Sequence, residues 1–254
     1  MRKIFTKIQL ILFILILGLR FASYGQERKI IPLNEHFFAI ETGGGEHVFN
    51  NVISSAIEKE LNEKIFTLDN RLVKVIKHTF GGEEKEVLLW TQEQILDANG
   101  KLQFTKLSFT NADTAVTKII VDDNLILDLA CLYNNCSGLF LNSDGDEEII
   151  DRNIFEPSFK SKMIWQEFLN SNLTYPLAAR RVGAQGEVMV GMQISDSGEV
   201  IESKILNSKI ISPVLVKEVE RIIKKYDKGF VPARDLNGKN MTAWMYFPVK
   251  FVLN

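Results

Sequence analysis

Residues with the chemistry of a catalytic or metal-binding site are scarce in this chain of 254 residues. There are three histidines, His36, His47 and His78, and none pairs with a cysteine or carboxylate at the spacing of a metal site or a catalytic triad. The sequence also lacks a nucleophile elbow, a phosphate-binding loop and a zinc-binding helix motif. Because catalysis needs groups of this kind, we expect no enzymatic activity, no metal site and no cofactor.

One acidic stretch begins like a calcium-binding loop. Asn142, Asp144 and Asp146 have the spacing of the first ligands of such a loop. However, Glu147 occupies the position that requires glycine, and Asn153 occupies the position of the closing bidentate carboxylate. Because these two positions do not fit a calcium-binding loop, we expect an acidic, solvated linker here.

The only two cysteines, Cys131 and Cys136, lie five positions apart. In an exported chain such a pair predicts a local disulfide, which would hold a turn at Asn134-Asn135. Two free thiols at a strand end are the alternative. No histidine is close enough in the sequence to make the pair a good metal site.

The elements that must position any site are clearest after Tyr175. A short amphipathic run, 177–182, and a glycine-punctuated loop, 183–186, precede strict alternation of apolar and other residues. The apolar positions are Val188, Val190, Met192 and Ile194. This period of two predicts a half-buried strand. Gly198 then provides the positive φ of a hairpin turn, and 200–206 returns as a second strand.

A helix and a final strand complete this module. Ser212-Pro213 places an N-cap residue before a proline at the first helical position, and apolar residues then recur at helical spacing as far as Tyr226. An alternating run from Met241 to Leu253 predicts the last strand. With an amphipathic helix expected over 159–169, the order is helix, strand, strand, helix, strand.

The N-terminal half contains short apolar runs broken by turn residues, which predicts an antiparallel β-meander. The segment 52–61 fits either a short helix or an irregular strand. Two similar segments, 68–72 and 96–102, each fit a turn that leads into a strand of a hairpin. Two copies are too few to establish a repeat architecture. The whole chain is therefore expected to be α+β.

The charge changes sign between the two halves. Residues 26–156 carry 12 Lys and Arg against 23 Asp and Glu, whereas residues 157–254 carry 14 against 9. This asymmetry supports an acidic β-rich domain over 26–156 and a separate domain over 157–254. For the acidic half we favour a solvated surface, and for the basic half an acidic partner surface is a second possibility. The acidic balance disfavours nucleic acid as a partner.

Residues 1–25 have the pattern of a secretory signal. Arg2, Lys3 and Lys7 precede an apolar run of twelve residues, and small residues stand before Gln26. Twelve residues are few for a spanning helix, and Arg20 interrupts any extension, so we expect cleavage and export to the periplasm. If the segment is retained, it becomes an inner-membrane anchor and the chain touches the membrane.

Ordered signals along the C-terminal module resemble the TonB C-terminal domain from about Phe159 to Asn254. The matching residues are Tyr175, Pro176, Gly183, Gly186, Asp196, Gly198, Pro232, Gly238, Pro248 and Phe251. The resemblance implies a periplasmic module that grips the plug end of outer-membrane receptors and helps to transmit inner-membrane energy to them. Two features depart from the energy transducer of that family. The chain has only six prolines and no proline-rich stretch, and its N-terminal segment has no histidine to contact motor proteins.

The last strand is the element through which such a module would act. Pro248 has no backbone donor, so the strand is expected at the border of a sheet, where an extended peptide can add to it. The resemblance implies that a short N-terminal segment of a TonB-dependent receptor pairs with this strand. The candidate contacts are Thr242, Ala243, Trp244, Met245, Tyr246 and Phe247. The side chain of Phe247 is expected to belong to the core.

Three functions are consistent with these features. The leading one is a periplasmic protein that binds a segment of an outer-membrane receptor or of another envelope protein. The second is an anchored energy transducer for TonB-dependent transmembrane transport. The third is a scaffold in which border strands of two copies pair with each other.

Overall fold

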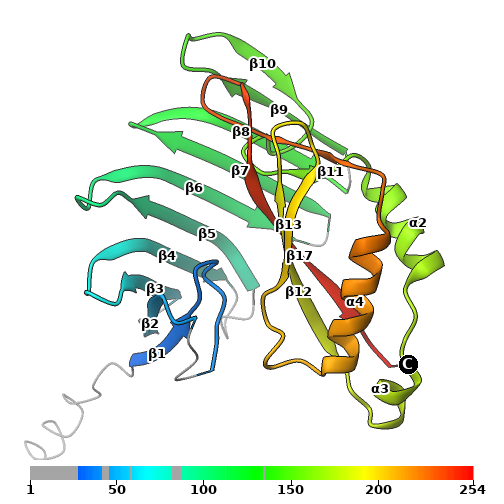
Figure 1. Cartoon of the computed structure of the whole chain (residues 1–254). Coiled ribbons are helices and arrows are strands. Elements are labelled where there is room, and N and C mark those ends of the chain that lie inside the picture. The colour runs from blue at the N-terminus through cyan, green and yellow to red at the C-terminus, as the bar shows by residue number, and fades with distance from the viewer. Residues whose placement is uncertain are drawn as a thin grey trace, which may run out of the picture.

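The computed structural model describes residues 28–41, 46–57, 59–81, 87–111, 113–133 and 135–253. The predicted signal segment, 1–25, lies outside the described residues. The described residues form a sheet of ten strands and a smaller module in which helices and strands are combined. Figure 1 shows that the large sheet is curved and lies beside this module. The predicted α+β class and the antiparallel meander of the N-terminal half are confirmed.

The large sheet follows chain order, and each strand pairs antiparallel with the next. Its strands are β1 (Arg28–Leu33), β2 (Phe49–Ile57), β3 (Glu60–Thr67), β4 (Leu72–Gly81), β5 (Val87–Leu96), β6 (Leu102–Thr110), β7 (Thr114–Val121), β8 (Asn124–Leu132), β9 (Asn135–Leu141) and β10 (Glu147–Ile150). The segment 52–61, for which a helix was one expectation, belongs to the β2–β3 hairpin in its described residues, 52–57 and 59–61. Pairing along both strands of that hairpin outweighs its weak local helical pattern.

Five turns among the described residues share one hydrogen-bonding pattern. In each, a side-chain oxygen of the first residue accepts the N–H of the residue four positions later, and the fourth residue has a positive φ. The turns span 67–71, 97–101, 142–146, 195–199 and 235–239. Such a turn needs Asp, Asn, Ser or Thr first and Gly or Asn fourth. The stretch that begins at Asn142 is therefore a hairpin turn between β9 and β10, and its expected role as a linker was wrong.

The C-terminal module is built on a sheet with the strand order β13–β12–β17. Its helices and strands are β11 (Ser158–Phe159), α2 (Lys162–Asn172), α3 (Leu177–Arg181), β12 (Gly186–Ile194), β13 (Val200–Ile205), α4 (Pro213–Lys225), β14 (Phe230–Val231), β15 (Ala233–Arg234), β16 (Asn240–Met241) and β17 (Ala243–Phe251). Helices α2 and α4 cover the face of this sheet that is turned away from the large sheet (Figure 1). The predicted order of the five main elements is confirmed.

The core of the module lies between that sheet and α4. The apolar face of α4 buries Leu215, Val219 and Ile222 against the predicted inward positions of β12, among them Val188 and Val190. All five side chains are fully buried. Burying an aliphatic side chain of this size contributes about 2 kcal/mol, so this contact fixes the helix on the sheet.

The first helix begins later than its sequence pattern predicts. The expected range was 159–169, but α2 begins at Lys162, after the N-cap residue Ser161, whose Oγ accepts the N–H of Ile164 at 3.3 Å. Phe159 instead lies in β11 and stacks on Trp165 with 4.4 Å between ring centroids. A cap and an aromatic contact therefore outweigh the helical spacing of Phe159.

Candidate functional site

The residues that carry the family resemblance fix the ends of the three-stranded sheet. The Tyr175 hydroxyl donates to the carbonyl of Ala184 at 2.5 Å, and its ring meets that of Phe251 at a centroid distance of 5.5 Å. Gly183 has a φ of 65°, which favours glycine in the loop between these contacts. The C-terminal end of β17 is thereby held against the loop that precedes β12.

Gly198 closes the hairpin between β12 and β13 against a distant segment. Its φ is 85°, and a Cβ at this position would lie 2.4 Å from the carbonyl oxygen of Phe230. Phe230 donates its N–H to the carbonyl of Gly198 at 3.2 Å, and Asn240 donates its side-chain amide to the carbonyl of Asp196 at 3.1 Å. This hairpin tip thus supports the segment that leads into β17.

β17 lies at the border of its sheet, as Pro248 predicted. The backbone N–H and C=O of Met189 on β12 bond to Asn207 and Leu206, on the β13 side, at 2.9 Å each. The register partner of Met189 on β17 is Pro248. Partners in an antiparallel pair point their backbone groups either toward each other or away from each other. Pro248 therefore directs its backbone away from β12, and so do the alternate residues Trp244, Tyr246 and Lys250.

These outward backbone groups form a free edge. Among the described residues, no backbone hydrogen bond joins them to a further strand. The edge offers both the N–H and the C=O of Trp244, Tyr246 and Lys250, but only the C=O of Pro248. We call the outward backbone groups of these four residues the β17 edge.

The six candidate contacts fall into two classes. The side chains of Met245 and Phe247 are buried in the core, and their backbone groups point to β12. Thr242 precedes the strand, Ala243 and Trp244 are half-buried, and Tyr246 is exposed. Of the six, only Trp244 and Tyr246 contribute to the β17 edge. Since backbone direction depends on register with β12, the hydrophobic pattern alone does not distinguish the two classes.

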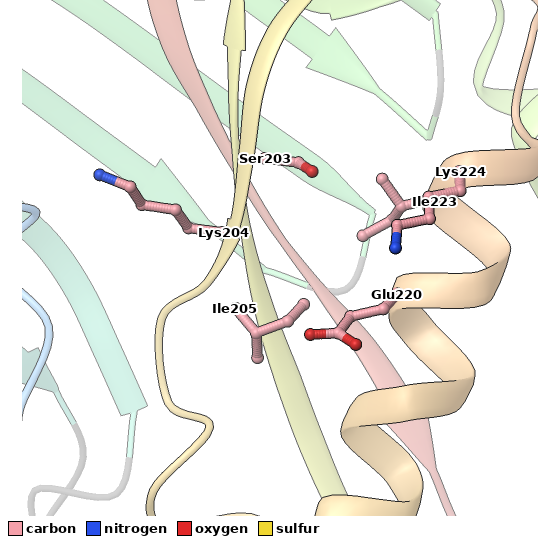
Figure 2. A pocket seen from close by; sticks show the side chains of 6 residues that line it. All are labelled: Ser203, Lys204, Ile205, Glu220, Ile223 and Lys224. Atoms are coloured by element: carbon pink, nitrogen blue, oxygen red, sulfur yellow. The ribbon is translucent and has the colours of Figure 1, made fainter.

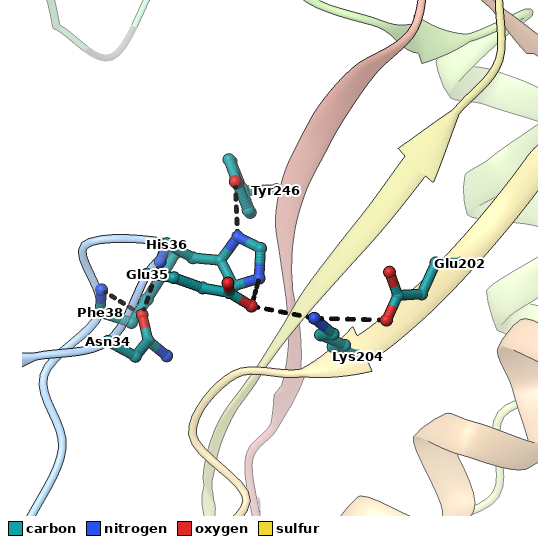
Figure 3. A network of polar contacts seen from close by, with 7 residues as sticks. All are labelled: Asn34, Glu35, His36, Phe38, Glu202, Lys204 and Tyr246. Atoms are coloured by element: carbon teal, nitrogen blue, oxygen red, sulfur yellow. Dashed lines mark hydrogen bonds and ion pairs between the residues drawn. The ribbon is translucent and has the colours of Figure 1, made fainter. Parts of the chain in front are cut away.

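A loop of the N-terminal half covers part of the outer face of β17, at Trp244 and Tyr246. His36 places its Nδ1 3.0 Å from the Tyr246 hydroxyl (Figure 3). Its ring centroid lies 4.4 Å from that of Trp244. Only 7% of the His36 side chain is exposed. This burial lowers the pKa of His36, and burial likewise raises the pKa of Tyr246. The loop covers side chains on the outer face and makes no backbone hydrogen bond to the β17 edge within the described ranges.

Comparison with known families decides what this module is. The family described as Gram-negative bacterial TonB protein C-terminal matches residues 171–253. Those residues form a TonB C-terminal domain. No curated protein and no solved structure matches the chain.

The TonB C-terminal domain is a domain of proteins that take part in TonB-dependent transport. Domains of this family are non-enzymatic, occur in proteins of the cell envelope and interact in general with outer-membrane receptors. Among the described residues, no helix is long and apolar enough to cross a membrane. The ranges that the structure describes also contain no group of three potential metal-ligating side chains.

The acidic half supplies a partner for the basic TonB C-terminal domain within the same chain. Lys204 of β13 pairs with Glu35 at 2.9 Å, and Lys209 pairs with Glu46 at 3.7 Å. At the other end of the contact, Arg234 of β15 pairs with Glu148 of β10 at 2.7 Å. In all three pairs the acid comes from the N-terminal half. The opposite charges of the halves therefore meet inside this molecule.

Backbone contacts join the two parts near Arg234. Its N–H donates to the carbonyl of Ile154 at 2.7 Å, and Ser143 donates its N–H to the carbonyl of Leu236 at 3.0 Å. The Arg152 guanidinium donates to the carbonyl of Pro232 at 2.9 Å. Burial lowers the pKa of Arg152.

The two cysteines form a disulfide in the structure. Cys131 and Cys136 are register partners at the ends of β8 and β9, so the bond closes that hairpin. Asn134, which the sequence places in the turn, lies outside the described residues. The disulfide is far along the chain from β17 and takes no part in the β17 edge.

His36 is the residue of this site that sequence reasoning missed. It precedes Tyr246 by 210 positions, and no local pattern links the two. Its neighbours Asn34 and Phe38 form a small loop in which Asn34 Oδ1 accepts the N–H groups of His36 and Phe38 at 2.9 and 3.0 Å. An Asn that leads a short polar turn was the only available signal.

Proposed function

We propose that this chain is a periplasmic protein whose TonB C-terminal domain captures an extended segment of an outer-membrane TonB-dependent receptor by adding it to the β17 edge. The observation that carries the proposal is the row of outward backbone groups on a border strand. Such a row is a template for a further strand, and the family match supplies the class of partner.

Pro248 limits the register of the captured segment. The β17 edge offers both a donor and an acceptor at Trp244 and Tyr246, but only an acceptor at Pro248. Full ladder bonding is therefore available on the N-terminal side of Pro248. We expect the guest to centre on Trp244 and Tyr246, with Lys250 as the nearest charged side chain beyond them.

The two faces of β17 present different side chains beside the edge. They therefore favour a guest in which successive residues alternate between two kinds of side chain. One face of β17 belongs to the buried core and packs on Trp165 of α2, so guest residues on that side would lie near α2. On the other face lie Trp244 and Tyr246, together with His36 of the covering loop. Guest side chains on this outer face would meet aromatic rings. Backbone bonds would supply affinity, and these rings would supply preference among guest sequences.

A matched pair of variants tests the β17 edge. Tyr246→Pro removes an outward N–H without removing a bond to β12, whereas Tyr246→Phe keeps the N–H and removes only the hydroxyl. Both variants lose the contact with Nδ1 of His36. Peptides from receptor N-termini are titrated into the full mature chain by calorimetry. We expect Tyr246→Pro to weaken binding roughly tenfold or more, because a backbone bond is lost and the proline ring obstructs the edge.

Tyr246→Phe should bind such peptides within about threefold of wild type, since its backbone edge is intact. Equal binding by Tyr246→Pro and wild type would show that the peptide does not use the β17 edge. The absence of binding to the folded wild-type chain at millimolar peptide would refute receptor capture.

Determining the N-terminal residue of the mature protein tests export, because a start at Gln26 means that no N-terminal anchor remains.

A further inference from the structure

A hollow of about 470 Å³ lies where the large sheet meets the C-terminal module. Strands β6, β7 and β8 line it from the large sheet, Phe155 lines it from the segment after β10, and Leu236 lines it from the C-terminal module. Leu236 belongs to the turn 235–239, which Ser143 of the large sheet holds by a backbone hydrogen bond. Small-molecule sites have volumes of this order and often occur where two parts of a chain meet.

The lining of this hollow is mainly apolar. Its apolar side chains include Leu102, Phe104, Val121, Ile126, Phe155 and Leu236. Four of these six pack against the buried core of the N-terminal half, whereas Leu102 and Leu236 are exposed. The hollow is therefore an open extension of that core, and an apolar ligand in it would remove apolar surface from water.

Two bulges of the large sheet lie at this hollow. The register between β5 and β6 leaves Gln103 without a partner position, and the register between β7 and β8 does the same for Ile126. Each is the extra residue of a bulge, and both line the hollow. Bulges change the direction of a side chain and are frequent beside binding sites.

The rim of the hollow carries one cation and one anion. Lys101 Nζ lies 3.9 Å from Oδ1 of Asp122, and both side chains are well exposed. An exposed pair at this distance is weak, so little is lost when each charge turns to a ligand. A head group that contains a phosphate and an ammonium complements this rim, with the phosphate at Lys101 and the ammonium at Asp122.

The hollow between β13 and α4 differs in size and in lining. Its volume is about 210 Å³. Figure 2 shows Ser203 of β13 and Glu220 of α4 pointing into the space between the two elements. An apolar chain in that space would take these polar groups out of water at a cost in free energy. The larger hollow is therefore the better site for an apolar ligand.

We propose that the hollow beside β6, β7 and β8 binds a single-chain zwitterionic amphiphile of the lysophospholipid class. The acyl chain lies along Phe104, Ile126 and Leu236, and the head group lies between Lys101 and Asp122. The volume is in the lower half of the range for small-molecule sites, which suits one chain.

Leu102→Asn and Leu125→Asn are a matched pair of variants that tests the apolar wall. The two leucines are 41% and 45% exposed, and asparagine has nearly the shape of leucine, but only Leu102 lines the hollow. Lauroyl lysophosphatidylethanolamine, kept below its micelle concentration, is titrated into the full mature chain by calorimetry. Leu102→Asn should bind roughly tenfold more weakly than wild type, and Leu125→Asn within about twofold of it. Equal binding by the two variants, or no binding by wild type, would overturn the proposal.

The head group is tested with laurate, which is an anion, and dodecylamine, which is a cation. Wild type should bind the lysophospholipid about fivefold more tightly than either, because only the zwitterion meets both charges of the rim. Lys101→Gln should lose the preference over dodecylamine, and Asp122→Asn the preference over laurate. Equal affinity of wild type for all three ligands would refute a zwitterionic ligand.

A measurement on the wild-type chain locates the ligand without any substitution. A lysophospholipid with a nitroxide at the end of its acyl chain should broaden the methyl NMR signals of Ile126 and Leu236. Leu139 and Ile149 are the controls, since they are exposed and, as strand neighbours of the buried Phe140 and Ile150, lie on the other face of the large sheet. Equal broadening at both places would mean unspecific adsorption and would contradict the site.

This inference does not depend on receptor capture, because the hollow and the β17 edge have no residue in common. Leu102→Asn should leave peptide binding unchanged, and Tyr246→Pro should leave binding of the lysophospholipid unchanged. If Tyr246→Pro weakens lysophospholipid binding as much as Leu102→Asn does, the ligand does not bind in the hollow alone and the proposed site is contradicted.

Discussion

Replacing His36 with alanine should loosen the contact between the N-terminal loop and β17. The ring makes an edge contact with Trp244, and its Nδ1 lies within hydrogen-bonding distance of the Tyr246 hydroxyl. An aromatic contact and a hydrogen bond are each worth about 1 kcal/mol. We therefore expect His36→Ala to lower the free energy of unfolding by about 2 kcal/mol at pH 7.5, measured by urea denaturation of the full chain. Tyr246→Phe should account for about half of this loss.

The effect of His36 should depend on pH. Burial holds its pKa in the folded state below the ordinary value of 6.5. As the pH falls below 6.5, the unfolded chain binds a proton that the folded chain does not, so the stabilisation from this histidine declines. The carboxylate of Glu35 and the ammonium of Lys204 also face the ring, and Glu202 faces Lys204 (Figure 3). Because hydrogen bonding and charge from Lys204 lower the pKa of Glu35, that carboxylate stays ionised throughout this window.

The assay compares wild type with His36→Ala from pH 8 to pH 5.5. The difference between their unfolding free energies should shrink as the pH falls, because only wild type carries the titrating ring. A difference below about 0.5 kcal/mol at pH 7.5 would refute the contact as a source of stability. A difference that stays constant down to pH 5.5 would refute the assignment of a lowered pKa to His36.

Three further changes test the fold around the site. Gly198→Ala should destabilise the chain by about 3 kcal/mol in urea denaturation, because the new methyl group meets the Phe230 carbonyl and the backbone φ is positive; an unchanged midpoint would contradict this. Replacing both Cys131 and Cys136 with serine should cost about 2 kcal/mol, the entropy of a short closed loop, and reduction of the wild-type chain should give the same loss. Arg234→Ala should cost about 1 kcal/mol, and Glu148→Ala on that background should cost little more, since the pair is already broken.

The hairpin turns are a part of the fold that can be predicted from the sequence. All five turns with the shared bonding pattern begin with a side-chain acceptor and place Gly or Asn at the fourth position, as in Asp97 to Gly100 and Asp235 to Gly238. This local pattern identifies them as hairpin turns. The stretch at Asn142 fits it as well, although its acidic residues suggest a calcium loop or a linker at first sight. Local chemistry determines such turns, so they are predictable.

The border position of β17 was also predictable, because Pro248 lacks a donor. Which residues of β17 face outward was not, because this depends on register with β12, and register arises from contacts between strands distant in the sequence. The N-terminal boundary of α2 was missed for a related reason, since Phe159 is held by aromatic partners from elsewhere in the chain. The packing of His36 on β17 is wholly tertiary.

The charge asymmetry gave an incomplete prediction. A basic C-terminal half with an acidic partner surface was one of two expectations, and the structure provides such a surface in the acidic half itself. Net charge identifies complementary surfaces but does not tell whether the partner is another protein or the same chain.

Amide hydrogen exchange of the full chain, followed residue by residue by NMR, tests the β17 edge most directly. In the free chain, the N–H groups of Trp244, Tyr246 and Lys250 should exchange fast, whereas those of Met245 and Phe247, bonded to β12, should exchange slowly. A bound receptor peptide should slow Trp244 and Tyr246 and leave Met245 and Phe247 unchanged. If Trp244 and Tyr246 are already protected in the free chain, or stay unprotected at saturating peptide, strand addition at β17 is contradicted.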